Sequence, residues 1–243
     1  MGPTWFRGAL AAALLAITAA AAPAVDRLER FRTVAREQLA VAADGPERQR
    51  AVAELYEVVD AEVLDSLRAG EPVAAPAFLR ERLDALTEAW GGATLRLLRV
   101  PAATGGAVLT LGLYSLAGVD GAGSLRVYVG TGPGAALAAS STHDGLLDAQ
   151  VWPAGPDRVV RVLALWSAAP AAHGARSLRA ELWEARAPDR VERSWSTAAQ
   201  WPDGLAVSDW RTRPGELIVR YEPPYAGWKP GCPAQLEHED QYR

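Results

Sequence analysis

The chain contains a single cysteine, Cys232, in 243 residues. It therefore cannot form an internal disulfide, and its stability must come from a buried core. A chain of this length with 49% hydrophobic residues can supply such a core. Histidine is almost as scarce, with three residues, and the sequence has neither an H-E-x-x-H nor a C-x-x-C pattern. The common zinc-binding patterns are thus absent, and we expect neither a metal nor a cofactor.

The chain also lacks a basic block. Lys229 is its only lysine, and the formal net charge is -4. Proteins that bind a phosphate backbone do so through clustered lysine and arginine side chains. The composition therefore argues against nucleic acid as a partner.

The N-terminal apolar stretch, Gly8 to Ala22, is shorter than the roughly 20 residues that span a bilayer. It follows Arg7 and runs into Ala22-Pro23-Ala24, which places small residues at both positions of an A-x-A cleavage site. This pattern is typical of a secretory signal peptide over residues 1–24. An uncleaved membrane anchor is the alternative. We expect an exported protein, periplasmic or extracellular, that begins at Val25 and has no stable membrane insertion after cleavage.

Residues 25–91 carry apolar residues at helical spacing. Asp44-Gly45-Pro46 and Ala69-Gly70-Glu71-Pro72 interrupt the pattern, which predicts about three helices, the last two beginning near Pro46 and Pro76. Each predicted helix has one apolar face, so we expect the helices to pack on the remainder of the chain. The apolar positions of this pattern include Leu28, Phe31, Val52, Leu55, Tyr56, Val59, Val63, Leu67, Phe78, Leu79, Leu83 and Leu86, with acids such as Glu54, Glu57, Glu62 and Asp65 on the solvated faces.

Residues 92–222 contain nine short runs rich in Val, Leu, Tyr and Trp, separated by turn signals such as Pro202-Asp203-Gly204. No long helical pattern intervenes, which favours an antiparallel meander. The sequence therefore predicts an α+β fold, in which an N-terminal helical segment packs on an antiparallel β-sheet or sandwich of about 8–9 strands.

Short motifs recur within this β region. "LYS" at 113–115 returns as "LWS" at 165–167, and "SLR" at 124–126 returns at 177–179. Two blade-like four-stranded units are one interpretation, although two blades cannot close a propeller. We favour an open sheet or a sandwich and keep partial propeller-like blades as a minority interpretation.

Two stretches resemble catalytic loops and are interpreted as turns. "GTGPGAALAASS" at 130–141 has glycines but neither the spacing nor the lysine of a phosphate-binding loop, which favours a flexible hairpin loop. "SSTHDG" at 140–145 places serine, His143 and aspartate together, but adjacent residues rarely form a catalytic triad. His143 remains the first residue to mutate if the protein is a hydrolase.

The last stretch, residues 223–243, is expected to lie over the surface of the β domain. It holds the candidate ligand-binding residues Trp228, Cys232, His238, Glu239 and Asp240. The Cys232–His238 spacing matches no common zinc pattern, so a structural role is favoured. Seven tryptophans, six in the β region and Trp228 after it, either fill the core or offer stacking surfaces for a glycan.

No catalytic or metal pattern stands out, and the sequence therefore favours a non-enzymatic binding or interaction module of the cell envelope, with a protein, peptide or glycan as partner. The alternative is a secreted hydrolase that uses histidine and carboxylates from separate strands. A third interpretation is a structural accessory that forms a homodimer through its helices. A concave pocket that unites His143, His173 or His238 with carboxylates would favour the enzyme, whereas a flat aromatic surface would favour binding.

Overall fold

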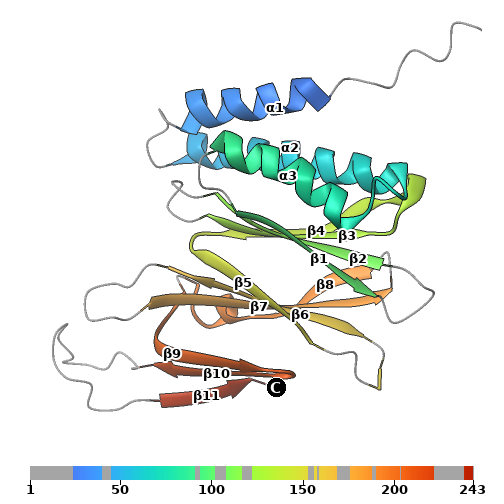
Figure 1. Cartoon of the computed structure of the whole chain (residues 1–243). Helices are drawn as coiled ribbons and strands as arrows, with labels where there is room; N and C mark the ends of the chain where they lie inside the picture. Colours follow the sequence, from blue (N-terminus) through green and yellow to red (C-terminus); the bar gives the residue numbers. More distant parts are fainter. Residues whose placement is uncertain are drawn as a thin grey trace, which may run out of the picture.

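Three helices precede two antiparallel sheets in the computed structural model of the chain (Figure 1). This confirms the predicted α+β class, and no sheet in the described part closes on itself or forms a propeller. The structure describes residues 24–39, 45–90, 94–101, 108–116, 122–152, 156–157, 159–168, 176–187, 190–202, 204–221 and 238–242. Nearly all of the predicted signal peptide lies outside these residues.

The helices form one layer that covers a face of the first sheet (Figure 1). α1 (Ala24–Thr33) continues into a π-helical turn (Val34–Leu39), and α2 (Pro46–Ala69) and α3 (Pro76–Trp90) follow. Both later helices begin at a proline, whose missing N–H costs nothing in the first turn. None of the helices in the described ranges combines the length and the apolar composition needed to cross a membrane.

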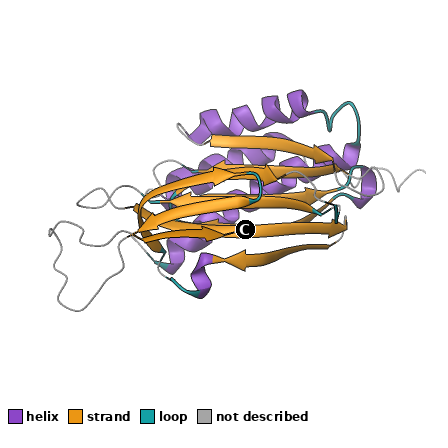
Figure 2. Cartoon of the chain, turned by 90° about the horizontal axis from the view of Figure 1, so that it is seen from below, coloured by secondary structure: helices purple, strands orange, loops and turns teal. Residues whose placement is uncertain are grey.

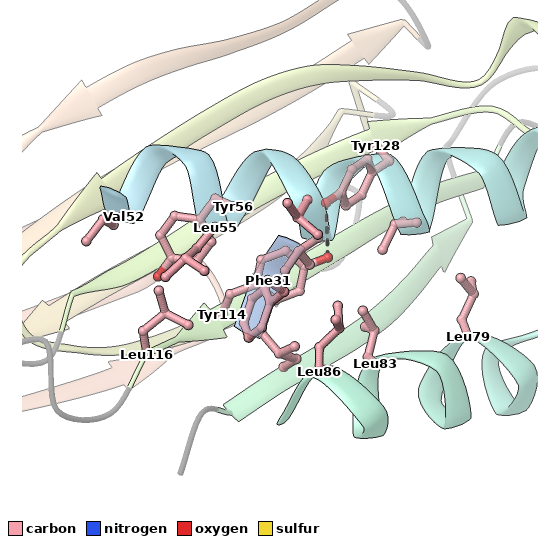
Figure 3. Close-up of a cluster of buried hydrophobic side chains, with 14 of the residues drawn as sticks. Phe31, Val52, Leu55, Tyr56, Leu79, Leu83, Leu86, Tyr114, Leu116 and Tyr128 are labelled. Atoms are coloured by element: carbon pink, nitrogen blue, oxygen red, sulfur yellow. Dashed lines mark hydrogen bonds between the residues drawn. The ribbon is translucent and has the colours of Figure 1, made fainter. Parts of the chain in front are cut away.

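The helical layer is held by the apolar faces that the sequence pattern predicts. α2 buries Leu55, Val59, Val63 and Leu67 completely, and each contributes about 1.5–3 kcal/mol of transfer free energy. Figure 3 shows side chains of α2 and α3 converging with Phe31 of α1 on Tyr114 and Tyr128 of the first sheet.

Two side chains of this layer differ from the expectation. Phe78 was predicted to face the core and is 39% exposed. The face of α3 that packs on the core is formed by Leu79, Leu83 and Leu86 instead. Glu62 was predicted to face solvent and is buried, 6% exposed, where the guanidinium groups of Arg27 and Arg82 compensate its charge.

The first sheet has the order β1-β2-β3-β4, formed by Thr94–Pro101, Val108–Ser115, Gly123–Val129 and Ala136–His143. Successive residues of a strand face opposite sides of the sheet. In β3, Leu125 and Val127 accordingly face the second sheet, whereas Tyr128 faces the helices.

β4 corrects the expectation of a flexible hairpin loop. Only Gly130–Ala135 forms a loop, which contains a short 3-10 turn, and Ala136–His143 pairs along β3. Alanine and serine have low intrinsic strand propensity, so the strand is stabilised by its pairing and packing partners. β11 (His238–Tyr242) is the second strand absent from the nine predicted runs, which raises the number of strands in the described residues above the expected eight or nine.

The second sheet has the order β11-β10-β9-β7-β6-β5, and β8 also pairs with β7. One edge of the long strand β7 is shared, because its first residues pair with β9 and its later residues pair with β8. The sheet therefore curls, and β9, β10 and β11 lie beneath β5–β8 in Figure 1, while Figure 2 shows the strands from below with the helices behind them. The strands are Leu146–Trp152, Val160–Ser167, Arg176–Ala187, Arg190–Ser196, Leu205–Arg213, Glu216–Tyr221 and His238–Tyr242.

The recurring motifs occupy equivalent strands of two stacked meanders. "LYS" ends β2 and "LWS" ends β6, while "SLR" lies in β3 and again in β7. β1–β4 and β5–β8 each pair in sequence order. The equivalent residues Tyr114 and Trp166 both face the helical side of their sheets. The repeat thus corresponds to two layers packed face to face.

Candidate ligand-binding cleft

A cleft of about 1080 Å³ opens where the helical layer and the two sheets meet. Its walls come from the N-terminal half of α2, from β3 and β4, from the start of β7 and from the turn that precedes β9. Small-molecule sites typically occupy clefts of roughly 300–1,000 Å³ with a few polar groups among apolar walls. The charged side chains that line this cleft are Arg48, Glu57, Asp60, Arg126, Asp144 and Arg179.

Arg126 lies at the buried end of the cleft. It alternates with Leu125 and Val127 in β3, so its side chain faces the helices while theirs face the second sheet. Its guanidinium carbon is 4.9 Å from the centroid of the Tyr56 ring, a cation–π contact. Arg126 is 8% exposed.

Asp60 of α2 lies beside Arg126, with 3.6 Å between its Oδ1 and the Arg126 Nε. The same Oδ1 accepts a hydrogen bond from the Tyr128 hydroxyl, whose oxygen is 3.0 Å from that of Tyr114. Burial raises the pKa of Asp60, and the charge of Arg126 and the Tyr128 hydroxyl only partly offset this effect. The carboxyl group is therefore held in place by a buried tyrosine pair.

The N-terminus of α2 forms another part of the cleft wall. Gly45, Arg48 and Gln49 line the cleft, and Gly45, the N-cap residue, has no side chain with which to cap the first turn. The free N–H groups of a first turn and the helix dipole together favour a negative charge nearby. The long helix α2 therefore adds positive potential to the same space that Arg126 faces.

His143 of β4 also lines the cleft. Arg179 donates from Nη1 to His143 Nδ1 at 3.1 Å, and because a guanidinium can only donate, the proton of the imidazole lies on Nε2. His143 Nε2 donates to Glu181 Oε1 at 3.0 Å. The imidazole packs edge-on against the Trp166 ring, with 4.8 Å between centroids.

Glu181 of β7, in the second sheet, holds His143 in position. It is 0% exposed, and besides His143 its carboxylate accepts from Arg193 at 2.7 Å and from the Trp183 indole at 3.1 Å. Burial by itself would raise the pKa of Glu181, but hydrogen bonds from His143, Ser141 and Arg193 outweigh it and lower the pKa to about 2. Glu181 is therefore an ionised, fully bonded carboxylate.

This group of side chains does not have the geometry of a nucleophilic triad. A triad histidine accepts from the nucleophile at one nitrogen and donates to the acid from the other. Here Ser141 Oγ and Glu181 Oε1 both lie 3.0 Å from the same nitrogen, Nε2, and Arg179 occupies Nδ1. His143 has no free lone pair in this arrangement with which to deprotonate Ser141.

Of the candidate residues named from the sequence, the structure places His143 in the cleft. His238, Glu239 and Asp240 lie on β11 at the edge of the second sheet. Asp240 accepts from the Tyr221 hydroxyl at 3.0 Å, while Glu239 pairs with Arg220 across the opposite face. Trp228 and Cys232 lie outside the described residues. Within the described part, no three His, Cys, Asp or Glu side chains are grouped so as to hold a metal.

The sequence analysis missed Arg126, Asp60, Arg179 and Glu181. One local signal was available, because Arg126 is the single charged residue in "SLRVYVG", a run otherwise made mostly of apolar and aromatic residues. A charge at such a position needs a partner or a role. The pairing of His143 with Glu181 joins residues 38 positions apart and depends on how the sheets stack.

No family model, no curated protein and no solved structure matches this chain. The fold and the cleft are therefore interpreted from their own geometry, which is that of an α+β protein with a polar cleft at the junction of its three layers.

Proposed function

We propose that the protein is an exported, non-enzymatic binding module and that the cleft between α2 and the two sheets holds its ligand. The observation that carries this proposal is the convergence of charged side chains from α2, β3, β4 and β7 on one open cleft with apolar walls. The ligand is a small organic molecule, or the end of a peptide or glycan chain that enters the cleft.

A hydrolase is the second candidate, because the cleft brings His143 together with carboxylates, the feature expected of an enzyme. Ser141 and His143 of β4 also meet Glu181 of β7. The shared nitrogen and the Arg179 contact at the other nitrogen support an architectural role for His143. Binding is therefore the function that this geometry favours.

Export is proposed from residues 1–24, which have the pattern of a signal peptide. Expressed with its own N-terminus in a secreting host, the protein should appear outside the cytoplasm and begin at Val25. Mass spectrometry of the exported material checks this, and an intact Met1 terminus there would contradict cleavage.

The binding function is tested by filling the cleft. Ala53 lines the cleft from α2, so Ala53→Trp should occupy the space with an indole. Ala85→Trp is the matched control, since Ala85 is an exposed residue of α3 away from the cleft lining. A fragment library screened by ligand-observed NMR should give binders that recognise the parent and Ala85→Trp but not Ala53→Trp.

Fragments that bind Ala53→Trp as well as the parent would contradict the proposal, as would the absence of any binder at millimolar concentration. A panel of ester and amide substrates addresses the second candidate. Turnover by the parent that His143→Gln abolishes would favour the hydrolase.

A further inference from the structure

We propose that the ligand of this cleft carries a carboxylate and that the guanidinium of Arg126 binds it. This inference rests on the proposed binding function and names the chemical class of the ligand. It depends on the incomplete pairing of Arg126, on the weakness of Asp60 as its counterion, and on the charges and apolar groups around both residues.

Arg126 is a nearly buried cation without a hydrogen-bond acceptor among the described residues. The Arg126 Nε is inaccessible to solvent and has no hydrogen-bond partner among the described residues. The guanidinium group contacts the ring of Tyr56 and the carboxylate of Asp60. Buried arginines normally have their donors satisfied, because an unpaired buried charge is costly. Arg126 lines the cleft, so an anion bound there would lie beside this incompletely compensated charge.

Asp60 is a poor counterion for this guanidinium. The closest approach of the two groups is 3.6 Å, beyond good hydrogen-bond distance, and Asp60 Oδ1 is already used by Tyr128. Burial raises the pKa of Asp60, and the neighbouring Glu57 raises it further, so the fold stabilises this carboxylate only in part. Asp60 thus leaves the guanidinium of Arg126, which lines the cleft, without a closely hydrogen-bonded counterion.

Other positive groups that line the cleft also favour an anion near Arg126. The uncapped first turn of α2 and the side chain of Arg48 line the same cleft. A helix N-terminus alone would not define a site, but here it lies in the same cleft as a buried guanidinium that lacks an acceptor.

The charge balance favours a carboxylate over a phosphate. A guanidinium binds either group through two parallel hydrogen bonds. Glu57 and Asp60 are close enough to repel a doubly charged phosphate more strongly than a singly charged carboxylate. Val52, Tyr56 and Leu137 provide apolar contact for the body of such an acid.

Three probes of similar shape distinguish a carboxylate ligand from a neutral or a phosphate ligand: benzoate, its neutral analogue benzamide, and phenyl phosphate. Binding of each probe to the full chain is measured by NMR titration. We expect benzoate to bind more tightly than either of the others. Arg126→Met should weaken benzoate binding by about tenfold or more, since it removes a charge-assisted pair of hydrogen bonds, and should leave benzamide binding nearly unchanged.

Arg96→Met is the matched control, because Arg96 is an exposed arginine of β1 in the same sheet and outside the cleft lining. It should bind benzoate as the parent does. If Arg126→Met does not fold, Asp60→Asn provides the second variant. By removing the competing carboxylate, it should strengthen benzoate binding by about threefold or more.

Benzamide binding as tight as benzoate binding, or benzoate binding unchanged in Arg126→Met and in Asp60→Asn, would overturn the carboxylate inference. A preference for phenyl phosphate would also overturn it and would indicate a phosphate ligand. None of these results would affect the proposed binding function, which the Ala53→Trp experiment tests separately.

Discussion

His143 Nε2 lies 3.0 Å from Glu181 Oε1, and this hydrogen bond joins β4 of the first sheet to β7 of the second. His143 lines the cleft, and its bond to Glu181 ties the two sheets together beside it. Because Glu181 has no solvent exposure, its charge depends on the partners that the fold provides. The pair therefore couples the shape of the cleft to the stability of the protein.

Replacing Glu181 with glutamine should destabilise the protein in a pH-dependent way. The pKa of Glu181 is lowered to about 2 in the folded state from 4.5 for an ordinary glutamate, so its ionised form stabilises folding. That contribution, on the order of 3 kcal/mol, is complete above pH 4.5 and is lost as the pH falls towards 2. Urea unfolding of the parent and of Glu181→Gln between pH 7 and pH 2 measures it.

Glu239→Gln is the control for this series, because the exposed pair of Glu239 with Arg220 is screened by solvent. It should change the free energy of unfolding little at any pH. A constant difference between the parent and Glu181→Gln across the whole pH range would contradict the assigned role of the Glu181 charge.

Any residue larger than glycine at position 112 should destabilise the protein while Tyr114 is present. A Cβ at Gly112 would overlap the ring of Tyr114, which lies back along β2 and is fully buried. Gly112→Ala should therefore destabilise the protein by about 1–3 kcal/mol, because the ring must leave its contact with Tyr128. Denaturant unfolding measures the loss.

The same substitution in a Tyr114→Ala background tests the mechanism. With the ring removed, adding Gly112→Ala should cost far less, so the two substitutions should be strongly non-additive. An equal cost of Gly112→Ala in both backgrounds would show that the Tyr114 ring is not the cause.

The helices and most of the strands follow from local signals, whereas the cleft does not. Pro46 and Pro76 begin α2 and α3 as predicted, because proline suits the first turn of a helix regardless of its surroundings. β4 lacks such a signal, since "ALAASSTH" has no β-branched run and a single large apolar residue, Leu137. The strand that carries His143 was therefore missed, and with it the approach of His143 to Glu181.

The recurring motifs illustrate a second limit. "LYS" and "LWS" correctly mark equivalent strands, β2 and β6, but sequence offsets do not determine whether two meanders sit side by side or stack. The arrangement depends on the long strand β7, which pairs with both β8 and β9 along one edge. This pairing lets the second sheet curl around a core of its own. That choice depends on contacts between residues distant in sequence.

Thr110→Val should stabilise the protein. The Thr110 side chain is 1% exposed, and its hydroxyl has no hydrogen-bond partner among the described residues. Valine has nearly the same shape, so the exchange removes a buried unsatisfied polar group without opening a cavity. We expect a gain of about 1 kcal/mol, which would raise the melting temperature by about 2–4 °C for a chain of this size.

Ser124→Ala is the matched control for Thr110→Val on the same face of the first sheet. The Ser124 hydroxyl lies 2.7 Å from that of Thr142, so its removal should lower the melting temperature. A lower melting temperature for Thr110→Val would mean that the Thr110 hydroxyl has a partner, such as a bound water.

The C-terminal segment is predicted to be structural, with no stoichiometric zinc bound by Cys232 and His238. His238 begins β11 opposite Tyr221, and Glu239 and Asp240 face opposite sides of that strand, which separates the two carboxylates. His238→Ala should lower the free energy of unfolding only modestly, because the side chain is exposed on an edge strand. Elemental analysis of the purified parent, of Cys232→Ser and of His238→Ala provides the measurement. One zinc per chain in the parent, lost in both variants, would make this segment the functional site instead of the cleft.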